Sequence, residues 1–266
     1  MSAPRERPPE HVCAAFGVRA ADAEPMPGGL AWRCGAVVLK PVTDRARAMF
    51  VARVLERVDV PGLRVARPIR ATDGRWILAG WAANRYVTGS TEQGRFDEVV
   101  LAAVRLSQAA VGLPRPSYRV PEDDVDAIAD RVAWGEREVP LDETKGGRWF
   151  EILAAARRPM RQPDQVVHGD LFGTVLFDGD AAPGIVDFSP YYRPAEWGAA
   201  VVAVDALAWG GADIELLHRW AHLPEWPQML LRAMLFRLAA NALNPKSTKA
   251  ALDGLRAAAR EVSEFV

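Results

Sequence analysis

The stretch from Val166 to Pro190, VVHGDLFGTVLFDGDAAPGIVDFSP, constrains the fold of this chain more than any other part of its sequence. Two short apolar runs, 175–177 and 184–186, flank a turn of Asp and Gly residues, which is the pattern of a β-hairpin. Because pairing of these strands brings Asp187 back towards the loop that carries Asp170, we expect two carboxylates at one end of the hairpin. One could act as a base or an orienting group and the other could bind magnesium, which prefers oxygen ligands. The alternative is an ordinary hairpin, since Asp and Gly are common in turns.

The order of residues in this stretch resembles the catalytic loop of the aminoglycoside phosphotransferase and choline kinase group, which are relatives of protein kinases. That group has His-Gly-Asp, a short loop ending in Asn, an apolar strand, a turn and Ile-Asp-Phe. The matching residues here are His168-Gly169-Asp170, 175–177 and 186–188. The resemblance covers most of the chain and implies an α+β, two-lobed, protein-kinase-like fold. We expect a small antiparallel β lobe with one helix at residues 1–85 and a larger, mainly helical lobe at 86–266.

The loop departs from the group's pattern at its end. It is one residue shorter, and Thr174 stands nearest to the place of the Asn that supplies a second metal oxygen in the group. A threonine hydroxyl can bind magnesium, but it lacks the carbonyl dipole of an amide and reaches less far. Two functions therefore stay open: turnover with Thr174 and Asp187 as metal ligands, or a degenerate kinase fold that binds a nucleotide or a partner without turnover.

The expected first lobe supplies a candidate phosphate contact. Residues 25–41 are predicted to form strand, turn and strand, with Lys40 at the end of the second strand. In the group, a lysine at this place reaches the α- and β-phosphates of ATP, and a glutamate on the next helix pairs with it. Asp44 is a candidate N-cap for that helix, and the resemblance assigns the glutamate to Glu56. The alternative is that Glu56 lies on a solvated helix face among neighbouring arginines.

Two further strands are expected at 64–69 and 75–82, joined by a turn, and residues 81–89 are predicted to cross to the second lobe. An extended crossing offers backbone amides and carbonyls to the edge of an adenine. Leu78 and Trp81 are therefore the predicted adenine contacts.

Helical periodicity dominates the rest of the chain. Residues 197–209 are apolar on all sides, which indicates a buried helix, and Asp205 within it needs a partner such as a backbone amide or an arginine. That partner could help to hold the catalytic loop in place. The aromatic segment 191–197 either lines a substrate pocket or packs the loop against the next helix. A helical ligand-binding protein that uses these aromatics is a third, different function.

Composition limits the class of partner. The chain has 266 residues, of which half are hydrophobic and a quarter charged, and its net charge of -1 gives no general attraction to nucleic acid or to a membrane surface. No apolar run approaches the roughly 18 residues that span a bilayer, and no secretory signal follows the first charges. Cys13 and Cys34 are too few for a disulfide framework or a zinc site. We therefore expect a cytoplasmic protein, and the scarcity of lysine suggests a GC-rich bacterial genome.

The resemblance implies a mechanism with ATP and Mg²⁺ as cofactors. Lys40 would contact the phosphates, and Asp187 with Thr174 would hold magnesium. Asp170 would accept the proton of, or orient, a hydroxyl group of a small molecule that attacks the γ-phosphate, while His168 braces the loop. The sequence thus predicts an ATP- and magnesium-dependent phosphotransferase for a small hydroxylated substrate.

Overall fold

The computed structural model describes residues 6–28 and 30–266, and internal contacts divide the chain into two compact units. The β unit comprises Met1–Thr91, Pro116–Tyr118 and Thr174–Phe188. The helical unit comprises Glu92–Arg115, Arg119–Gly173 and Ser189–Val266. The predicted hairpin therefore belongs to the β unit, although helical segments precede it in the sequence.

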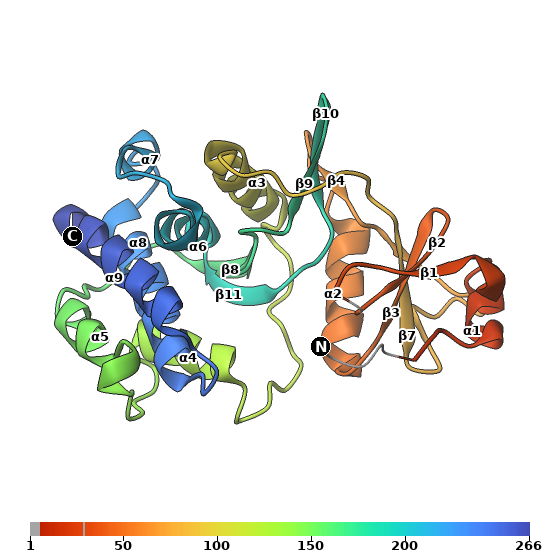
Figure 1. Ribbon diagram of the computed structural model, residues 1–266, viewed down its shortest axis with the longest axis horizontal. Helices are drawn as coiled ribbons and strands as arrows, with labels where there is room; N and C mark the ends of the chain where they lie inside the picture. Colours follow the sequence, from red (N-terminus) through yellow and green to blue (C-terminus); the bar gives the residue numbers. More distant parts are fainter. Residues whose placement is uncertain (1–5, 29) are drawn as a thin grey trace. The chain divides into compact units, whose positions relative to one another are not determined.

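An antiparallel sheet with the strand order β1-β2-β3-β7-β5 forms the centre of the β unit, and β6 pairs with β7 beside it (Figure 1). Its strands are β1 (Ala23–Pro25), β2 (Trp32–Cys34), β3 (Val37–Pro41), β5 (Pro68–Ile69), β6 (Ile77–Leu78) and β7 (Trp81–Arg85). Gly35 turns the chain between β2 and β3 with a φ of 60°, which a glycine adopts without strain. Lys40 lies in β3, where it faces Ala82 of β7 across the ladder. The predicted strand ending at this lysine is confirmed within one residue.

Helices cover the two faces of this sheet. Side chains of α1 (Glu10–Ala15) join a buried cluster with Leu39 and Trp81, and the short 3₁₀ helix η1 (Ala20–Asp22) follows α1. Side chains of α2 (Arg45–Arg57) pack in a second cluster that includes Ala82. Trp81 and Ala82 are consecutive strand residues and so point to opposite faces. The side chain of Asp44 accepts a hydrogen bond from the Arg47 N–H at 3.0 Å, which confirms the predicted N-cap of α2.

The hairpin predicted from 166–190 is present. Strands β9 (Val175–Asp178) and β10 (Ala181–Ile185) pair antiparallel, and β4 (Arg64–Val65) pairs parallel with β10, as Figure 1 shows. A Cβ at Gly184 would lie 2.5 Å from Cγ1 of Val87, so only glycine lets β10 come this close to the end of the first sheet. The backbone of Ser90 also exchanges hydrogen bonds of 3.0 and 2.8 Å with Phe177 of β9.

The predicted start of the crossing at Trp81 is wrong. Residues Trp81–Arg85 form β7, which pairs with β3 on one edge and with β5 and β6 on the other. The segment carries buried Trp81 and Ala83 on one face, which is the period-two pattern of a strand. The side-chain amide of Asn84 in this strand donates to the Ala66 carbonyl at 2.9 Å.

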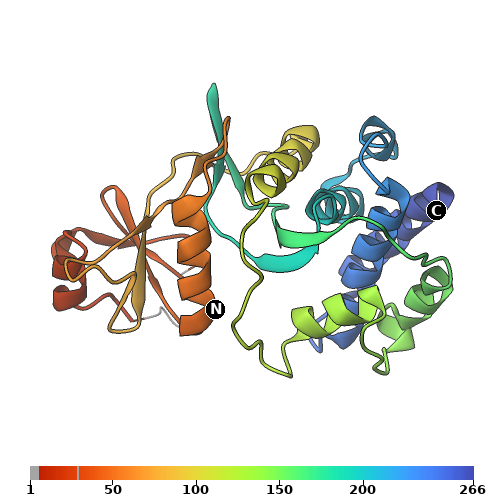
Figure 2. The same cartoon turned by 180° about the vertical axis from the view of Figure 1, so that it is seen from behind.

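The helical unit is arranged around α6, whose residues are all buried. Its helices are α3 (Phe96–Ala109), α4 (Val125–Trp134), α5 (Gly147–Ala154), α6 (Trp197–Asp205), α7 (Glu215–Arg219), α8 (Trp226–Leu243) and α9 (Lys249–Phe265), with a 3₁₀ turn η2 (Glu143–Lys145). A π-helical turn, η3 (Ala206–Gly210), continues α6, and α3 and α8 pack against α6. Strands β8 (Asp164–His168) and β11 (Pro190–Pro194) pair antiparallel next to α6 (Figure 2). The prediction of a helix buried on all sides is confirmed for residues 197–207, whereas Trp209 at the end of the predicted range is exposed.

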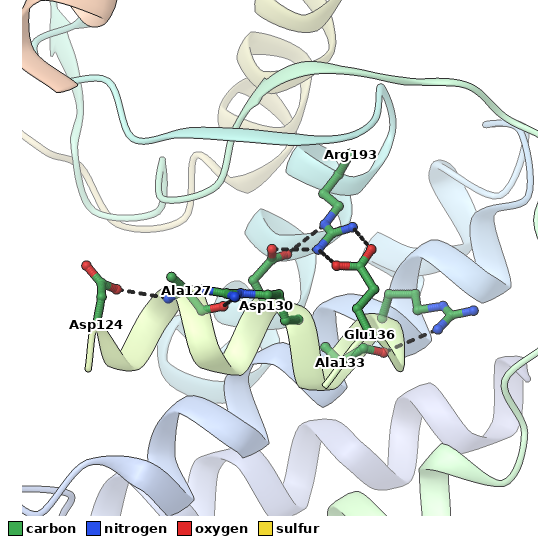
Figure 3. Close-up of polar contacts among 8 residues, drawn as sticks. Asp124, Ala127, Asp130, Ala133, Glu136 and Arg193 are labelled. Atoms are coloured by element: carbon green, nitrogen blue, oxygen red, sulfur yellow. Dashed lines mark hydrogen bonds and ion pairs between the residues drawn. The ribbon is translucent and has the colours of Figure 1, made fainter. Parts of the chain in front are cut away.

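An ion triad centred on the buried Arg193 joins β11 to α4 and to Glu136, which follows α4 (Figure 3). The Arg193 guanidinium lies 2.7 Å from Oδ2 of Asp130 and 2.6 Å from Oε1 of Glu136. Burial raises the pKa of Asp130 although Arg193 opposes the rise, whereas hydrogen bonds from Arg193 lower the pKa of Glu136. Within the described residues, no helix is long and apolar enough to cross a membrane.

Candidate active site

The loop that carries Asp170 is held tightly at the end of β8. The His168 side chain is buried, and its Nδ1 accepts a hydrogen bond of 3.0 Å from the backbone N–H of Asp170. The Gly169 N–H donates to the Ser189 carbonyl at 3.0 Å. A Cβ at Gly169 would lie 2.4 Å from the ring of Tyr191, so glycine is required where this aromatic ring covers the loop. The backbone on both sides of Asp170 is therefore fixed.

Asp170 is bonded to a buried cation from α8. Nη2 of Arg237 lies 3.1 Å from Oδ1 of Asp170, and Nε of Arg237 donates to Oδ1 of Asp205 at 2.7 Å. The side chains are 56% exposed for Asp170, 14% for Arg237 and 1% for Asp205. Burial opposes the charged guanidinium, but the attraction of both carboxylates outweighs it and raises the pKa of Arg237. The expectation that Asp205 has an arginine partner is confirmed.

Lys40 and Asp187 lie together in the β unit. Nζ of Lys40 is 3.8 Å from Oδ2 of Asp187 and donates to the Val186 carbonyl at 3.3 Å. Oδ1 of Asp187 accepts the N–H of Phe188 at 3.0 Å. The Asp187 side chain is 70% exposed, so this carboxylate can still reach a ligand. The structure thus brings together the two residues that the sequence assigns to phosphate and to metal.

Glu56 does not pair with Lys40, so this prediction is wrong. Nε and Nη2 of Arg70 each donate to one carboxylate oxygen of Glu56 at 3.0 Å, which is a bidentate pair. The same guanidinium lies 3.9 Å from the ring centroid of Trp76. The alternative of a solvated helix face is closer to the structure, but the partner is Arg70, which follows β5, and not an arginine of the same helix.

The residues predicted to contact adenine are part of the sheet. Leu78 and Trp81 are cross-strand partners in β6 and β7, and Pro41 pairs with Trp81 on the other edge. Trp81 is buried in the cluster under α1, and Leu78 packs against it. Their backbone lies within sheet pairing, so the reason for assigning them to adenine no longer holds. Thr174, which precedes β9, is half-buried.

Aromatic residues after the hairpin pack against the loop and against α8. Trp197 is buried, and its ring centroid lies 5.1 Å from that of Tyr191 and 5.4 Å from that of Phe236. Arg193 is held in the triad with α4. The packing alternative is confirmed, and a substrate pocket lined by Trp197 and Arg193 is wrong.

Sequence reasoning missed Arg237 and the aromatic support of the loop. Arg237 lies in the apolar sequence of α8, which also contains Arg232, and Asp205 lies in that of α6, so charges within apolar helices were the available signal. Phe172 stacks on Phe96 of α3 with ring centroids 6.5 Å apart. A Cβ at Gly210 would lie 2.9 Å from Phe172, so η3 touches the loop as well.

In the part of the chain that the structure describes, no group of three or more His, Cys, Asp or Glu side chains could hold a metal ion. A metal at this site would therefore need oxygen atoms from a ligand in addition to those of Asp187. Magnesium commonly binds in this way, through one or two carboxylates together with phosphate oxygens. The donor set around Asp187 is compatible with a nucleotide-bound magnesium ion.

The antiparallel sheet with its helices, the loop that carries Asp170 and the helical unit define a protein-kinase-like α+β fold, as predicted. The chain is similar over nearly its whole length to solved small-molecule kinases. A microcompartment-associated aminopropanol kinase matches with a TM-score of 0.62 and 15% identity, over 96% of this chain and 95% of that one. An amicoumacin kinase solved with AMP-PNP and Ca²⁺ matches with a TM-score of 0.58 and 13% identity, over 93% and 89%.

An aminoglycoside phosphotransferase, solved with AMP-PNP and hygromycin B, matches with a TM-score of 0.55 and 13% identity, over 87% of this chain and 89% of that one. At these identities the likeness shows the fold. No protein-family model matches the sequence, and no curated protein matches it either.

Proposed function

We propose that this protein is an ATP- and magnesium-dependent phosphotransferase that acts on a hydroxyl group of a small molecule. The observation that carries the proposal is the approach of Lys40 to Asp187 within 3.8 Å, in a chain with the fold of small-molecule kinases. In such kinases one cation binds phosphate oxygens and one carboxylate binds the metal. Lys40 lies in β3 and Asp187 follows β10, far apart in the sequence, so their meeting is a property of the fold.

The nucleotide and metal are assigned to the β unit. Lys40 would bind the phosphates, and Asp187 would supply a hard oxygen ligand, with the Thr174 hydroxyl as the second protein ligand. Magnesium, when bound, neutralises charge on the phosphate oxygens. The similar amicoumacin kinase was solved with AMP-PNP and Ca²⁺, which supports the use of a nucleotide and a divalent cation.

The acceptor hydroxyl is assigned to Asp170. Its carboxylate is more than half exposed, and Arg237 fixes one of its oxygens from the buried side. A hydroxyl that donates a hydrogen bond to this carboxylate is oriented by it, and its proton can pass to the carboxylate as the hydroxyl oxygen forms its bond to phosphorus. His168 holds the backbone of Asp170 and takes no proton in this scheme.

The test is a pair of isosteric substitutions. Asp170→Asn should reduce phosphoryl transfer by about 10²-fold or more, because the proton acceptor is lost, and should leave nucleotide affinity unchanged. Asp187→Asn should weaken the binding of AMP-PNP in the presence of Mg²⁺ but not in its absence.

Turnover would be measured with ATP against a panel of small alcohols, amino alcohols and sugars, and binding by calorimetry. Asp253→Asn on the exposed side of α9 is the matched control, and full turnover in both site variants would reject the proposal.

A second candidate is a degenerate kinase fold that binds a nucleotide or a partner without turnover. Two observations favour it: Glu56 is bonded to Arg70 and not to Lys40, and Thr174 stands near the place of the group's Asn. This candidate predicts magnesium-dependent nucleotide binding and no transfer to any acceptor. Activity that arises only in Thr174→Asn would support it, whereas turnover by the unaltered protein would exclude it.

A further inference from the structure

Trp209 is the only aromatic side chain that is exposed in the part of the chain that the structure describes. It is 45% exposed, whereas every other Trp, Tyr or Phe is buried or half-buried. It lies in η3, the π-helical turn after α6. Such π-helical turns are rare in proteins, and those that occur are often found at functional sites. An exposed indole at this place therefore calls for a physical reason.

The exposed indole is held in a fixed position by α9. Its Nε1 donates a hydrogen bond of 3.3 Å to the Ala251 carbonyl. A Cβ at Gly254 would lie 3.1 Å from Cδ1 of Trp209 and 2.1 Å from the Ala208 carbonyl oxygen. Because Gly254 has no side chain, η3 packs closely against α9. One edge of the Trp209 ring therefore contacts α9, and its indole N–H has a hydrogen-bond acceptor there. The surface left to solvent is flat and apolar.

Arg237 connects Trp209 to the proposed catalytic carboxylate. The Arg237 guanidinium carbon lies 5.9 Å from the centroid of the Trp209 ring, and the same guanidinium donates to Asp170. The next residue, Gly210, contacts Phe172 of the catalytic loop. One arginine side chain thus reaches both Trp209 and the residue assigned to the acceptor hydroxyl.

We propose that Trp209 is a specificity-determining residue of the acceptor site, and that the substrate is a small alcohol carrying a flat apolar group, such as an aromatic ring. The inference rests on the proposed function. A rigid indole supplies a large contact area at little cost in side-chain freedom, and it favours stacked or edge-to-face rings. An exposed indole can also bind an organic cation. Arg237 already places a cation against this ring, which opposes a second one.

The test is a binding measurement that does not depend on turnover. The chain has nine tryptophans, so ¹⁵N labelling of the indoles gives separate NMR signals, and Trp209→Phe assigns the one of interest. The probes are matched pairs that differ only in the ring, L-phenylalaninol against L-alaninol and phenyl against methyl β-D-glucoside, with choline as the cationic probe. The ring-bearing member of at least one pair should shift the Trp209 signal and bind about fivefold more tightly than its partner. Trp209→Ala should remove that preference, and Trp149→Phe should keep it.

Several results would overturn the inference. These are equal binding of both members in every pair, shifts confined to other indoles, a Trp209 response to choline alone, and no response up to the solubility limit. Asp170→Asn separates this test from that of the proposed function. It should reduce transfer to any acceptor by about 10²-fold or more, while the ring-bearing probe should still shift the Trp209 signal. If the unaltered protein transfers phosphate to no acceptor, the proposed phosphotransferase function is rejected. If no ring-bearing probe shifts the Trp209 signal, the proposed class of acceptor is rejected.

Discussion

Arg237 is the residue on which the charge balance around Asp170 depends. It is nearly buried and lies between Asp205, which is buried, and Asp170, which is exposed. Taking charges out of water is costly, and an unpaired buried charge costs far more than a paired one. The Asp205 carboxylate therefore keeps the arginine charged in place, and the arginine in turn directs Asp170.

Removing the cation should destabilise the protein strongly. Arg237→Met leaves the Asp205 charge without its partner, and we expect the free energy of unfolding to fall by about 3–5 kcal/mol. Urea unfolding measures this change. The double variant Arg237→Met with Asp205→Leu replaces the pair by apolar groups and should recover most of the loss. A cost below about 1 kcal/mol for the single variant, as for a surface ion pair, would contradict the buried bridge.

The triad of Arg193 predicts a pH dependence at Glu136. Arg193 lowers the pKa of Glu136, so the folded state binds this proton less readily than the unfolded chain. The stabilisation is present above the ordinary pKa of 4.5 and is lost as the pH falls through the lower pKa of the folded state. Glu136→Gln should cost about 1 kcal/mol at pH 7, since the half-exposed carboxylate is screened by solvent, and less at pH 3. The free energy of unfolding at pH 7 and pH 3 measures the cost of the substitution, with exposed Glu138→Gln as the control. A cost of Glu136→Gln that is larger at pH 3 than at pH 7 would contradict the stabilising role of this carboxylate.

At the scale of elements, the packing of α9 on η3 depends on one glycine. In an open helix, Gly→Ala stabilises by about 0.5–1 kcal/mol, because alanine has less freedom to lose on folding. At Gly254 the new Cβ would lie 2.1 Å from the Ala208 carbonyl oxygen. We therefore expect Gly254→Ala to destabilise the protein by about 1–3 kcal/mol and not to stabilise it. Thermal unfolding decides between the two, with exposed Ser263→Ala on the same helix as the control, and a stabilised Gly254→Ala would contradict the close contact.

Local patterns predicted many elements, and long-range contacts explain the errors. The hairpin of β9 and β10, the Asp44 cap and the all-apolar α6 each follow from residues that are neighbours in the chain. The sequence cannot predict the partner of Glu56, because Arg70 is placed beside it only by the return of the chain through β5. The strand of the Trp81 segment cannot be predicted from its own residues either, because its partner strands, β3 and β5, are contributed by other parts of the chain.

The same contrast holds for the candidate site. Asp170, Asp187 and His168 lie in one motif and could be found from it, and Lys40 could be found because lysine is scarce. Arg237 and Trp209 belong to no motif, and their importance depends on the packing of α8 and α9 around η3. Charges within apolar helices were a usable signal, although α8 contains Arg232 as well as Arg237. An exposed tryptophan was not, since exposure is a property of the folded chain.

At the scale of the whole molecule, the proposed roles divide between the two units. Lys40, Thr174 and Asp187 belong to the β unit, whereas Asp170, Arg237 and Trp209 belong to the helical unit. The residues assigned to the nucleotide and those assigned to the acceptor can therefore be altered separately. The proposed function predicts that each group of substitutions affects one ligand and spares the other.

Nucleotide binding should stabilise the protein through the β-unit residues alone. A ligand that binds only the folded state at 100 times its dissociation constant stabilises by about 2.7 kcal/mol. We expect AMP-PNP with Mg²⁺ to have this effect on the unaltered protein and on Asp170→Asn, because Asp170 is assigned to the acceptor. Asp187→Asn should lose the part of this stabilisation that depends on magnesium, because the substitution removes the negatively charged oxygen that binds the ion. Thermal unfolding with and without EDTA measures the effect at matched nucleotide concentrations. Equal stabilisation of Asp187→Asn, or none in Asp170→Asn, would place the nucleotide on other residues and leave the Lys40–Asp187 pair as a structural contact.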